Sequence, residues 1–220
     1  MILPLRDSHP SHRIPWITTG IIVANAVIFL YKVYLDPFTR NGLVAEWGLT
    51  PSRFALPTLL TYMFLHGTWF HVISNLWLLW IFGDNVEALL GKGYYLLFYL
   101  LCGVAAGLLQ MAVSPDSRLP IVGASGALAG VMGAYLVKFP HARITTLLFA
   151  IFIFTVEAPA ALILIIWFVM QVISGIWTFG QFAQGGVAWF AHVGGFVAGA
   201  LLILVLPTAR PYATRRDLSW

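Results

Sequence analysis

The chain has 220 residues, of which 60% are hydrophobic and only 9% are charged. A water-soluble domain carries roughly 25% charged residues, so this composition excludes an ordinary soluble enzyme and predicts a protein whose surface faces lipid. The net charge is +4, and no basic stripe lies outside the short C-terminal tail, which argues against nucleic-acid binding. The single cysteine, Cys102, lies in an apolar run, so we expect a core residue, with no intramolecular disulfide and no cysteine-based metal site.

Apolar runs along the chain predict six membrane-spanning helices, since a span needs about 20 such residues. Residues 1–15 are polar, and the first run lacks the small-residue exit of a signal peptide, so we expect a retained span. The six runs are residues 16–35, 69–90, 94–113, 125–137, 159–178 and 187–206. We therefore expect an all-α membrane protein with an N-terminal segment (1–15), a six-span domain (16–206) and a basic C-terminal tail (207–220).

Two stretches, residues 144–156 and 37–68, do not fit a simple span. Residues 144–156 are apolar but number only 13, which predicts a membrane-embedded loop or an interfacial segment. The run at 125–137 is equally short, and we interpret it as a span because it is rich in small residues. Residues 37–68 form a long connection with proline, glycine and scattered apolar side chains, which predicts a loop that dips into the membrane interface.

Lysine and arginine predict the orientation of the spans, because they are enriched in cytoplasmic loops. If the N-terminus is cytoplasmic, eight of these residues lie on the cytoplasmic side and four on the outer side. We therefore expect both termini in the cytoplasm and a multi-pass protein of a membrane such as the bacterial inner membrane. The sequence gives no indication of the oligomeric state.

Polar side chains inside these apolar runs are the candidate functional residues, because a polar group in lipid is costly and therefore functional by default. His71 and Asn75 are four residues apart near the start of the second run, so they share one helical face. Ser125 begins the fourth run, and His192 lies near the start of the sixth. In the expected orientation all three runs point inward from the outer surface, which places these residues at a similar depth.

A serine and a histidine at one depth predict nucleophilic catalysis. A serine hydroxyl is a weak nucleophile unless a neighbouring base takes its proton, and histidine can do so near neutral pH. Small residues recur every fourth position after Gly126 and after Ala191, which predicts that these two helices approach closely. No Asp or Glu lies in a run at this depth, since Asp84 and Glu87 are about three to four turns below His71. We therefore expect a Ser125–His192 dyad without an acidic third member.

These residues resemble the motifs of the rhomboid intramembrane serine proteases. The resemblance rests on the sequence GASG at residues 123–126, on the spacing of His66, His71 and Asn75, and on the glycines after His192. It covers residues 15–206, including the six spans and the long first loop. It implies cleavage of single-pass transmembrane proteins near the outer face of the membrane, through an acyl-enzyme and without cofactor or metal.

The resemblance also implies a role for each matching residue. Ser125 would be the nucleophile and His192 the general base. His71, Asn75 and the backbone N–H of Ser125 would form the oxyanion hole. The supporting residues would be Gly123, Gly126 and His66, of which His66 would hold the first loop, and the glycine-rich connection at residues 180–186 would cap the site.

The sequence departs from the family pattern in two places. Many members carry Trp-Arg in the first loop where this chain has Pro57-Thr58, which bears on how the loop is anchored to lipid. Some members place an aromatic residue four positions after the nucleophile, beneath the catalytic histidine ring. This chain has Ala129 there, so the sequence does not indicate what orients the ring of His192.

Other interpretations of the same residues remain. Taken alone, Ser125 could cap a helix and His192 could be a packing residue. His66, His71 and His192 could bind a metal, although they lack a carboxylate or cysteine partner. A rhomboid-like protein that binds membrane proteins without cutting them is the main alternative function. A transporter or channel is disfavoured, since we find neither charged residues near the midplane nor paired repeats.

Overall fold

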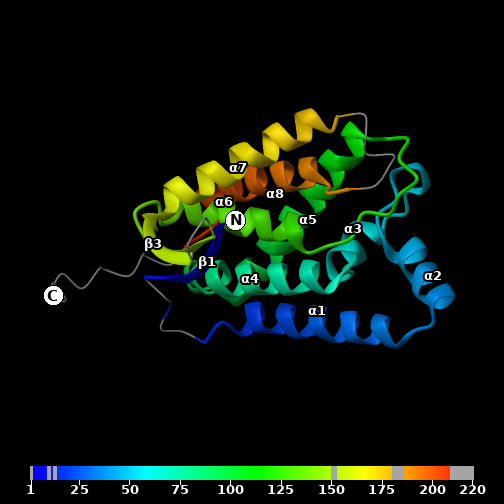
Figure 1. Ribbon diagram of the computed structural model, residues 1–220, viewed down its shortest axis with the longest axis horizontal. Helices are drawn as coiled ribbons and strands as arrows, with labels where there is room; N and C mark the ends of the chain where they lie inside the picture. Colours follow the sequence, from blue (N-terminus) through cyan, green and yellow to red (C-terminus); the bar gives the residue numbers. More distant parts are fainter. Residues whose placement is uncertain (1, 9–10, 12–13, 150–152, 180–185, 209–220) are drawn as a thin grey trace, which may run out of the picture.

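The computed structural model describes residues 2–8, 11, 14–149, 153–179 and 186–208. Long helices lie side by side in a bundle, and a small sheet covers one end of it (Figure 1). The long helices are α1 (Trp16–Tyr34), α4 (Trp69–Leu90), α5 (Lys92–Val113), α6 (Ser125–Lys138), α7 (Ala160–Trp177) and α8 (Trp189–Val205). The expected all-α membrane bundle is confirmed.

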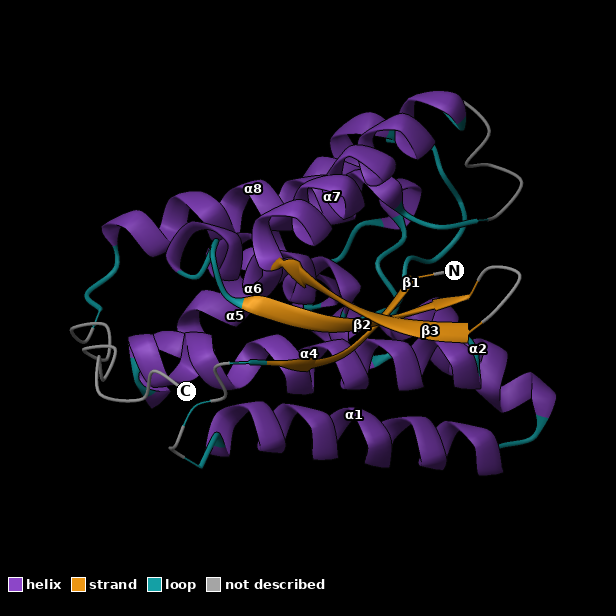
Figure 2. Cartoon of the chain, turned by 60° about the vertical axis from the view of Figure 1, so that its left-hand side comes forward, coloured by secondary structure: helices purple, strands orange, loops and turns teal. Residues whose placement is uncertain are grey.

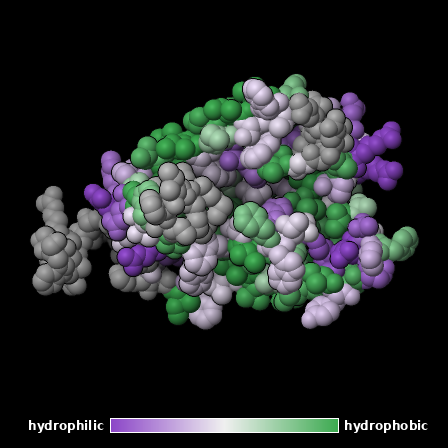
Figure 3. Space-filling model, viewed as in Figure 1, coloured by the Kyte–Doolittle hydropathy of each residue, from purple (hydrophilic) through white to green (hydrophobic). Residues whose placement is uncertain are grey.

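The observed helices follow the predicted apolar runs, and their lengths differ widely. By length and composition, α1, α5 and α7 can each cross a membrane, whereas α8 is apolar but has only 17 residues. Helix α6 has 14 residues, and every residue from Gly126 to Tyr135 is buried. The short helix α6 therefore lies in the interior of the bundle. On the surface, hydrophilic side chains gather towards the two ends of the long axis, and hydrophobic ones follow the upper flank (Figure 3).

The long connection between α1 and α4 is built of short helical segments: α2 (Pro37–Trp47), η1 (Pro51–Arg53), α3 (Thr58–Thr61) and η2 (Tyr62–Phe64). The carboxylate of Asp36 caps α2, because it accepts the backbone N–H groups of Phe38 at 3.0 Å and Thr39 at 3.1 Å. The apolar residues of this connection divide between core and surface. Leu59 is buried, whereas Trp47 and Phe54 are exposed, as contact with an interface requires.

A three-stranded antiparallel sheet corrects the expectation for residues 144–156. Strands β1 (Ile2–Asp7), β2 (Arg143–Phe149) and β3 (Ile153–Pro159) pair in the order β1-β2-β3 (Figure 2). The expected loop or interfacial segment is thus mostly strand, with residues 150–152 outside the described part. Its length suits two short strands. The third strand, β1, comes from the N-terminal segment. It pairs with β2, so that Ile2 lies opposite Leu148 and Asp7 opposite Ile144.

Buried acidic side chains fasten this end of the bundle. The Asp7 carboxylate accepts the side-chain amide of Asn85 at 2.6 Å and the hydroxyl of Tyr135, so β1 is tied to α4 and α6. The Glu87 carboxylate accepts the backbone N–H of Ile17 at 2.9 Å and that of Thr18 at 2.8 Å. The Glu87 carboxylate therefore binds the free N–H groups at the start of α1, and the Asp7 carboxylate attaches β1 to the bundle. Both lie at the end of the bundle away from the candidate site.

Candidate active site

Ser125 is the first residue of α6, and the turn before it depends on a glycine. Gly123 has φ +135°, a conformation that residues with a side chain rarely adopt. Its backbone N–H donates to the carbonyl of Tyr62 at 2.9 Å, and Ile121 two residues earlier pairs with Leu49. The first loop therefore holds the strand-like approach to α6 and delivers Ser125 at the helix start.

His192 reaches Ser125 because α6 and α8 touch through small residues. A Cβ atom placed on Gly195 would overlap the carbonyl oxygen of Gly126, so no larger residue fits at that crossing. One turn earlier on α8, the ring Nε2 of His192 lies 2.8 Å from the hydroxyl of Ser125. His192 is buried, and Ser125 is partly exposed. The close approach expected from the glycine spacing thus brings the His192 ring to the serine hydroxyl.

The other ring nitrogen of His192 contacts Gln171 of α7, a residue that sequence reasoning missed. The carbonyl oxygen of the Gln171 side chain lies 2.7 Å from Nδ1, and its amide nitrogen donates to the carbonyl of Trp167 at 3.3 Å. The Trp167 ring also faces the His192 ring, with centroids 5.9 Å apart. Gln171 is a buried polar residue in a strongly apolar helix, and the rule that drew attention to His71 would have found it.

Trp167 and Gln171 provide the support for the His192 ring that Ala129 does not. Ala129 is fully buried, and its methyl group offers no ring on which His192 could stack. The aromatic surface comes instead from α7, together with Trp189, whose ring meets His192 edge-on at 6.1 Å. The orientation of His192 therefore depends on a neighbouring helix and not on the helix of Ser125.

The His71 ring lies beside Gly123 and Ser125. A Cβ atom placed on Gly123 would lie 2.7 Å from both Cε1 and Nε2 of His71 and 3.5 Å from the hydroxyl oxygen of Ser125. The start of α4 is fixed by Thr68, whose hydroxyl accepts the backbone N–H of His71 at 3.1 Å. The His71 ring nitrogen Nε2 thus lies in the immediate surroundings of the serine hydroxyl.

Asn75 is bound to His66. The amide nitrogen of Asn75 donates to Nε2 of His66 at 3.0 Å, and the backbone N–H of Ala124 points to the same nitrogen at 3.4 Å. Two donors on one ring nitrogen require it to be unprotonated, so His66 is neutral. Burial, and then the neighbouring His71 and Lys32, hold the pKa of His66 well below its usual range. His66 therefore links α4 to the backbone just before Ser125.

Lys32 secures the backbone of the same loop from the C-terminal end of α1. Its ammonium group donates to the carbonyl of His66 and, at 3.3 Å, to the carbonyl of Gly67. The side chain is buried, so these carbonyls replace much of its hydration. In the sequence, Lys32 counts only among the positive residues that predict the orientation of the spans. No sequence pattern indicates which carbonyl groups lie near it.

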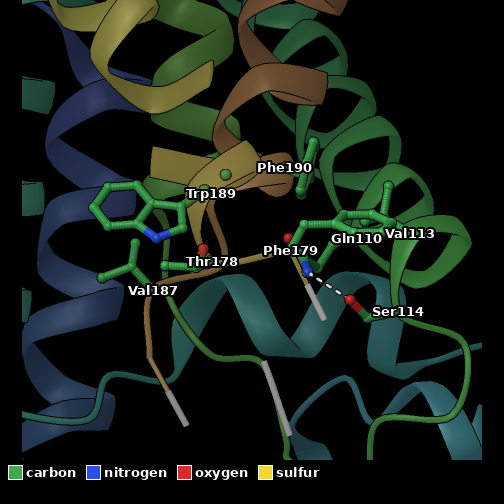
Figure 4. A pocket seen from close by; sticks show the side chains of 9 residues that line it. Gln110, Val113, Ser114, Thr178, Phe179, Val187, Trp189 and Phe190 are labelled. Carbon is green, nitrogen blue, oxygen red and sulfur yellow. Dashed lines mark hydrogen bonds between the residues drawn. The ribbon is translucent and has the colours of Figure 1, made fainter. Parts of the chain in front are cut away.

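The start of α8 is held by Gln110 of α5. Its side-chain oxygen accepts the backbone N–H of Ala191 at 3.1 Å, and its amide nitrogen donates to the Ser114 hydroxyl at 3.5 Å (Figure 4). A small cavity of about 10 Å³ opens beside Gln110, between the ends of α5 and α7 and the start of α8. Trp189 and Phe190 line it from α8. Residues 180–185, most of the expected cap, lie outside the described residues.

Comparisons with known proteins point in one direction. A family model described as "Rhomboid domain" matches residues 53–208. The mouse "Presenilin-associated rhomboid-like protein, mitochondrial" is 32% identical over 142 residues, which are 62% of this chain and 37% of that protein. "Rhomboid protein 1, mitochondrial" of Saccharomyces cerevisiae is 32% identical over 144 residues, 63% of this chain and 38% of that protein. "RHOMBOID-like protein 1" of Arabidopsis thaliana is 29% identical over 221 residues, 86% and 52% respectively. The chain thus spans about half or less of the length of these relatives.

Proposed function

The chain belongs to the rhomboid family, and we propose that it is an intramembrane serine endopeptidase that uses Ser125 as nucleophile and His192 as general base. The observation that supports this most directly is the 2.8 Å distance between the Ser125 hydroxyl and Nε2 of His192. An imidazole at hydrogen-bond distance can take the hydroxyl proton as the serine oxygen attacks, which is how a serine becomes a nucleophile.

The reaction then proceeds in two halves. Nε2 of His192 takes the hydroxyl proton while the Ser125 oxygen adds to the scissile carbonyl carbon. The tetrahedral intermediate collapses, the C–N bond breaks, and His192 returns the proton to the leaving amine. A water molecule next gives a proton to His192 and adds to the ester carbonyl carbon. The C–O bond to Ser125 then breaks, and His192 returns the proton to the Ser125 oxygen, which releases the new acid and needs no redox partner or cofactor.

The negative oxygen of each tetrahedral intermediate needs donors near Ser125. We propose the His71 ring, the Asn75 side-chain amide and the Ser125 backbone N–H for this role. The position of the His71 ring against Gly123 supports its part. Asn75 donates to His66 through one amide hydrogen, which leaves the second for a substrate. One such donor is typically worth about 3 kcal/mol of transition-state stabilisation.

The proposed substrates are single-pass membrane proteins whose helix unwinds near its outer end. The site lies at the end of the bundle away from the sheet and from the positive residues Arg6, Lys138 and Arg143, which supports an outer site with cytoplasmic termini. Two of the three relatives described above are mitochondrial by name. Their names do not support the expectation of a bacterial inner membrane, so the proposal is limited to an integral membrane protein.

A catalytically inactive rhomboid-like protein that binds membrane proteins is the second candidate. A binding protein has no use for a base on the serine hydroxyl. The chain nevertheless brings together Ser125, His192 and His71 from three helices, and buries a polar partner, Gln171, behind the base. These contacts favour the enzyme.

Cleavage of a fluorescent single-span model substrate by the purified protein in liposomes tests the proposal. We expect Ser125→Ala and His192→Ala to abolish cleavage and to abolish labelling by a serine-directed fluorophosphonate. Ser52→Ala and His141→Ala are matched controls, since both side chains are exposed and away from the site. Cleavage that survives in Ser125→Ala would overturn the mechanism. A folded wild-type protein that neither cleaves any of several such substrates nor takes the label would favour the inactive alternative.

A further inference from the structure

A chain of hydrogen bonds runs from α7 through His192 to Ser125. The Gln171 amide nitrogen lies 3.3 Å from the Trp167 carbonyl oxygen, and the Gln171 carbonyl oxygen lies 2.7 Å from His192 Nδ1. His192 Nε2 then lies 2.8 Å from the Ser125 hydroxyl. The Trp167 backbone carbonyl at one end of this row of hydrogen bonds can only accept. It therefore determines which atom donates and which accepts in each of the following hydrogen bonds.

The directions follow in order. The end of the Gln171 amide that faces the Trp167 carbonyl must be the NH₂ group, because two facing carbonyl oxygens repel each other. The oxygen of that amide therefore faces His192, and Nδ1 must carry the hydrogen. A neutral imidazole has one N–H, so Nε2 is left with its lone pair towards the Ser125 hydroxyl. This tautomer is the one that a general base for Ser125 needs.

We propose that Gln171 is a positioning residue that fixes the tautomer and the ring orientation of His192. The activity readouts of this proposal rest on the proposed function, whereas the tautomer itself does not. Gln171 occupies the position that a carboxylate holds behind the histidine in a Ser-His-Asp triad. It belongs to α7, whereas Ser125 belongs to α6 and His192 to α8. His192 is thereby positioned from outside the pair of helices that bring it to Ser125.

An amide suits this position better than a carboxylate. Helix α7 contains no charged residue, and much of its surface is exposed and apolar, as a lipid-facing helix requires. A carboxylate buried there would cost far more than an amide and would have no N–H for the Trp167 carbonyl. His71 of α4 is the other titratable group near His192. The described parts of α5, α6 and α8 place no charged residue beside it, because Lys92 and Lys138 lie at the opposite end.

Three variants separate positioning from packing. Gln171→Leu keeps the approximate volume and removes the acceptor, so we expect kcat to fall about tenfold with little change in KM. Gln171→Glu keeps an acceptor but adds a charge that favours protonated His192. For this variant we expect the acidic limb of the pH–rate profile to move upward by about one unit. Met170→Leu is the control, since the neighbouring Met170 side chain is exposed and we expect wild-type kinetics.

A readout that needs no activity completes the test. Nitrogen-15 NMR of labelled histidine in bilayers distinguishes the two tautomers of a neutral imidazole. We expect His192 to carry its proton on Nδ1 in the wild type and to populate both tautomers in Gln171→Leu. An unchanged tautomer in Gln171→Leu would overturn the proposal. So would a pH profile of Gln171→Glu that does not move, combined with a kcat loss in Gln171→Leu that only accompanies a lower unfolding temperature. A wild type that shows the Nδ1–H tautomer but no cleavage would count against the protease function alone.

Discussion

Gly199 of α8 packs directly on Gly130 of α6, and a Cβ atom placed on Gly199 would overlap the carbonyl oxygen of Gly130. The same relationship joins Gly195 to Gly126 one turn nearer the candidate site. The two helices are therefore in backbone contact along a line that ends at Ser125 and His192. The close approach at these glycines therefore controls the distance between the two side chains.

We expect Gly199→Ala to destabilise the protein by about 1–3 kcal/mol, the usual cost of overpacking, and to reduce cleavage because the helices must separate. Gly20→Ala is the control, since nothing lies within 4 Å of a Cβ atom placed on Gly20 of α1. Alanine is the better helix former, so this change is neutral or mildly stabilising. Unfolding temperatures in detergent and cleavage rates check both variants. If Gly199→Ala is as stable and active as Gly20→Ala, the glycine line does not control the site.

We expect His71→Ala to lower kcat about 10²–10³-fold while KM stays nearly constant, because a donor to the oxyanion acts only in the transition state. The measurement is steady-state cleavage of the model substrate in detergent. Phe70→Ala is the matched control one residue earlier, since its side chain is exposed and faces away from the bundle. A rise in KM with unchanged kcat would assign His71 to substrate binding instead.

We expect the stability of the protein to depend on His66 below neutral pH. The folded pKa of His66, which lies in the loop before α4, is below its ordinary value of 6.5, so the unfolded chain takes up a proton that the folded protein excludes. Stability is therefore fully present above pH 6.5 and falls as pH drops below it. Between pH 7 and pH 5 this amounts to about 2 kcal/mol.

His66→Gln isolates this contribution, since glutamine keeps an acceptor for Asn75 and Ala124 but does not titrate. Unfolding titrations with sodium dodecyl sulfate in mixed micelles, at several pH values, give the free energy of unfolding of both proteins. The wild type should lose more stability on acidification than the variant. Parallel curves would mean that His66 takes up its proton at the same pH in the folded and unfolded states, as an imidazole exposed to water does.

The helices and most of the polar residues of the site can be predicted from the amino-acid sequence alone. Lipid requires long apolar runs whose backbone groups are satisfied within each helix, so hydropathy predicts where a span begins and ends. The same solvent makes each polar residue in a span conspicuous. Ser125, His192 and His71 stand out in this way, and the distribution of lysine and arginine is enough to predict that they share one depth.

The connections between those residues come from the tertiary fold. The sheet pairs β1 with β2, two strands that are far apart in the sequence, and no local pattern encodes a partner at that separation. The attachment of Asn75 to His66, and of Gln171 to His192, depends on which faces of α4, α7 and α8 turn inward. Periodicity is a property of one helix, whereas a hydrogen bond between helices depends on how their side chains pack. The sequence therefore predicted the dyad, and the fold added the glutamine that positions its base.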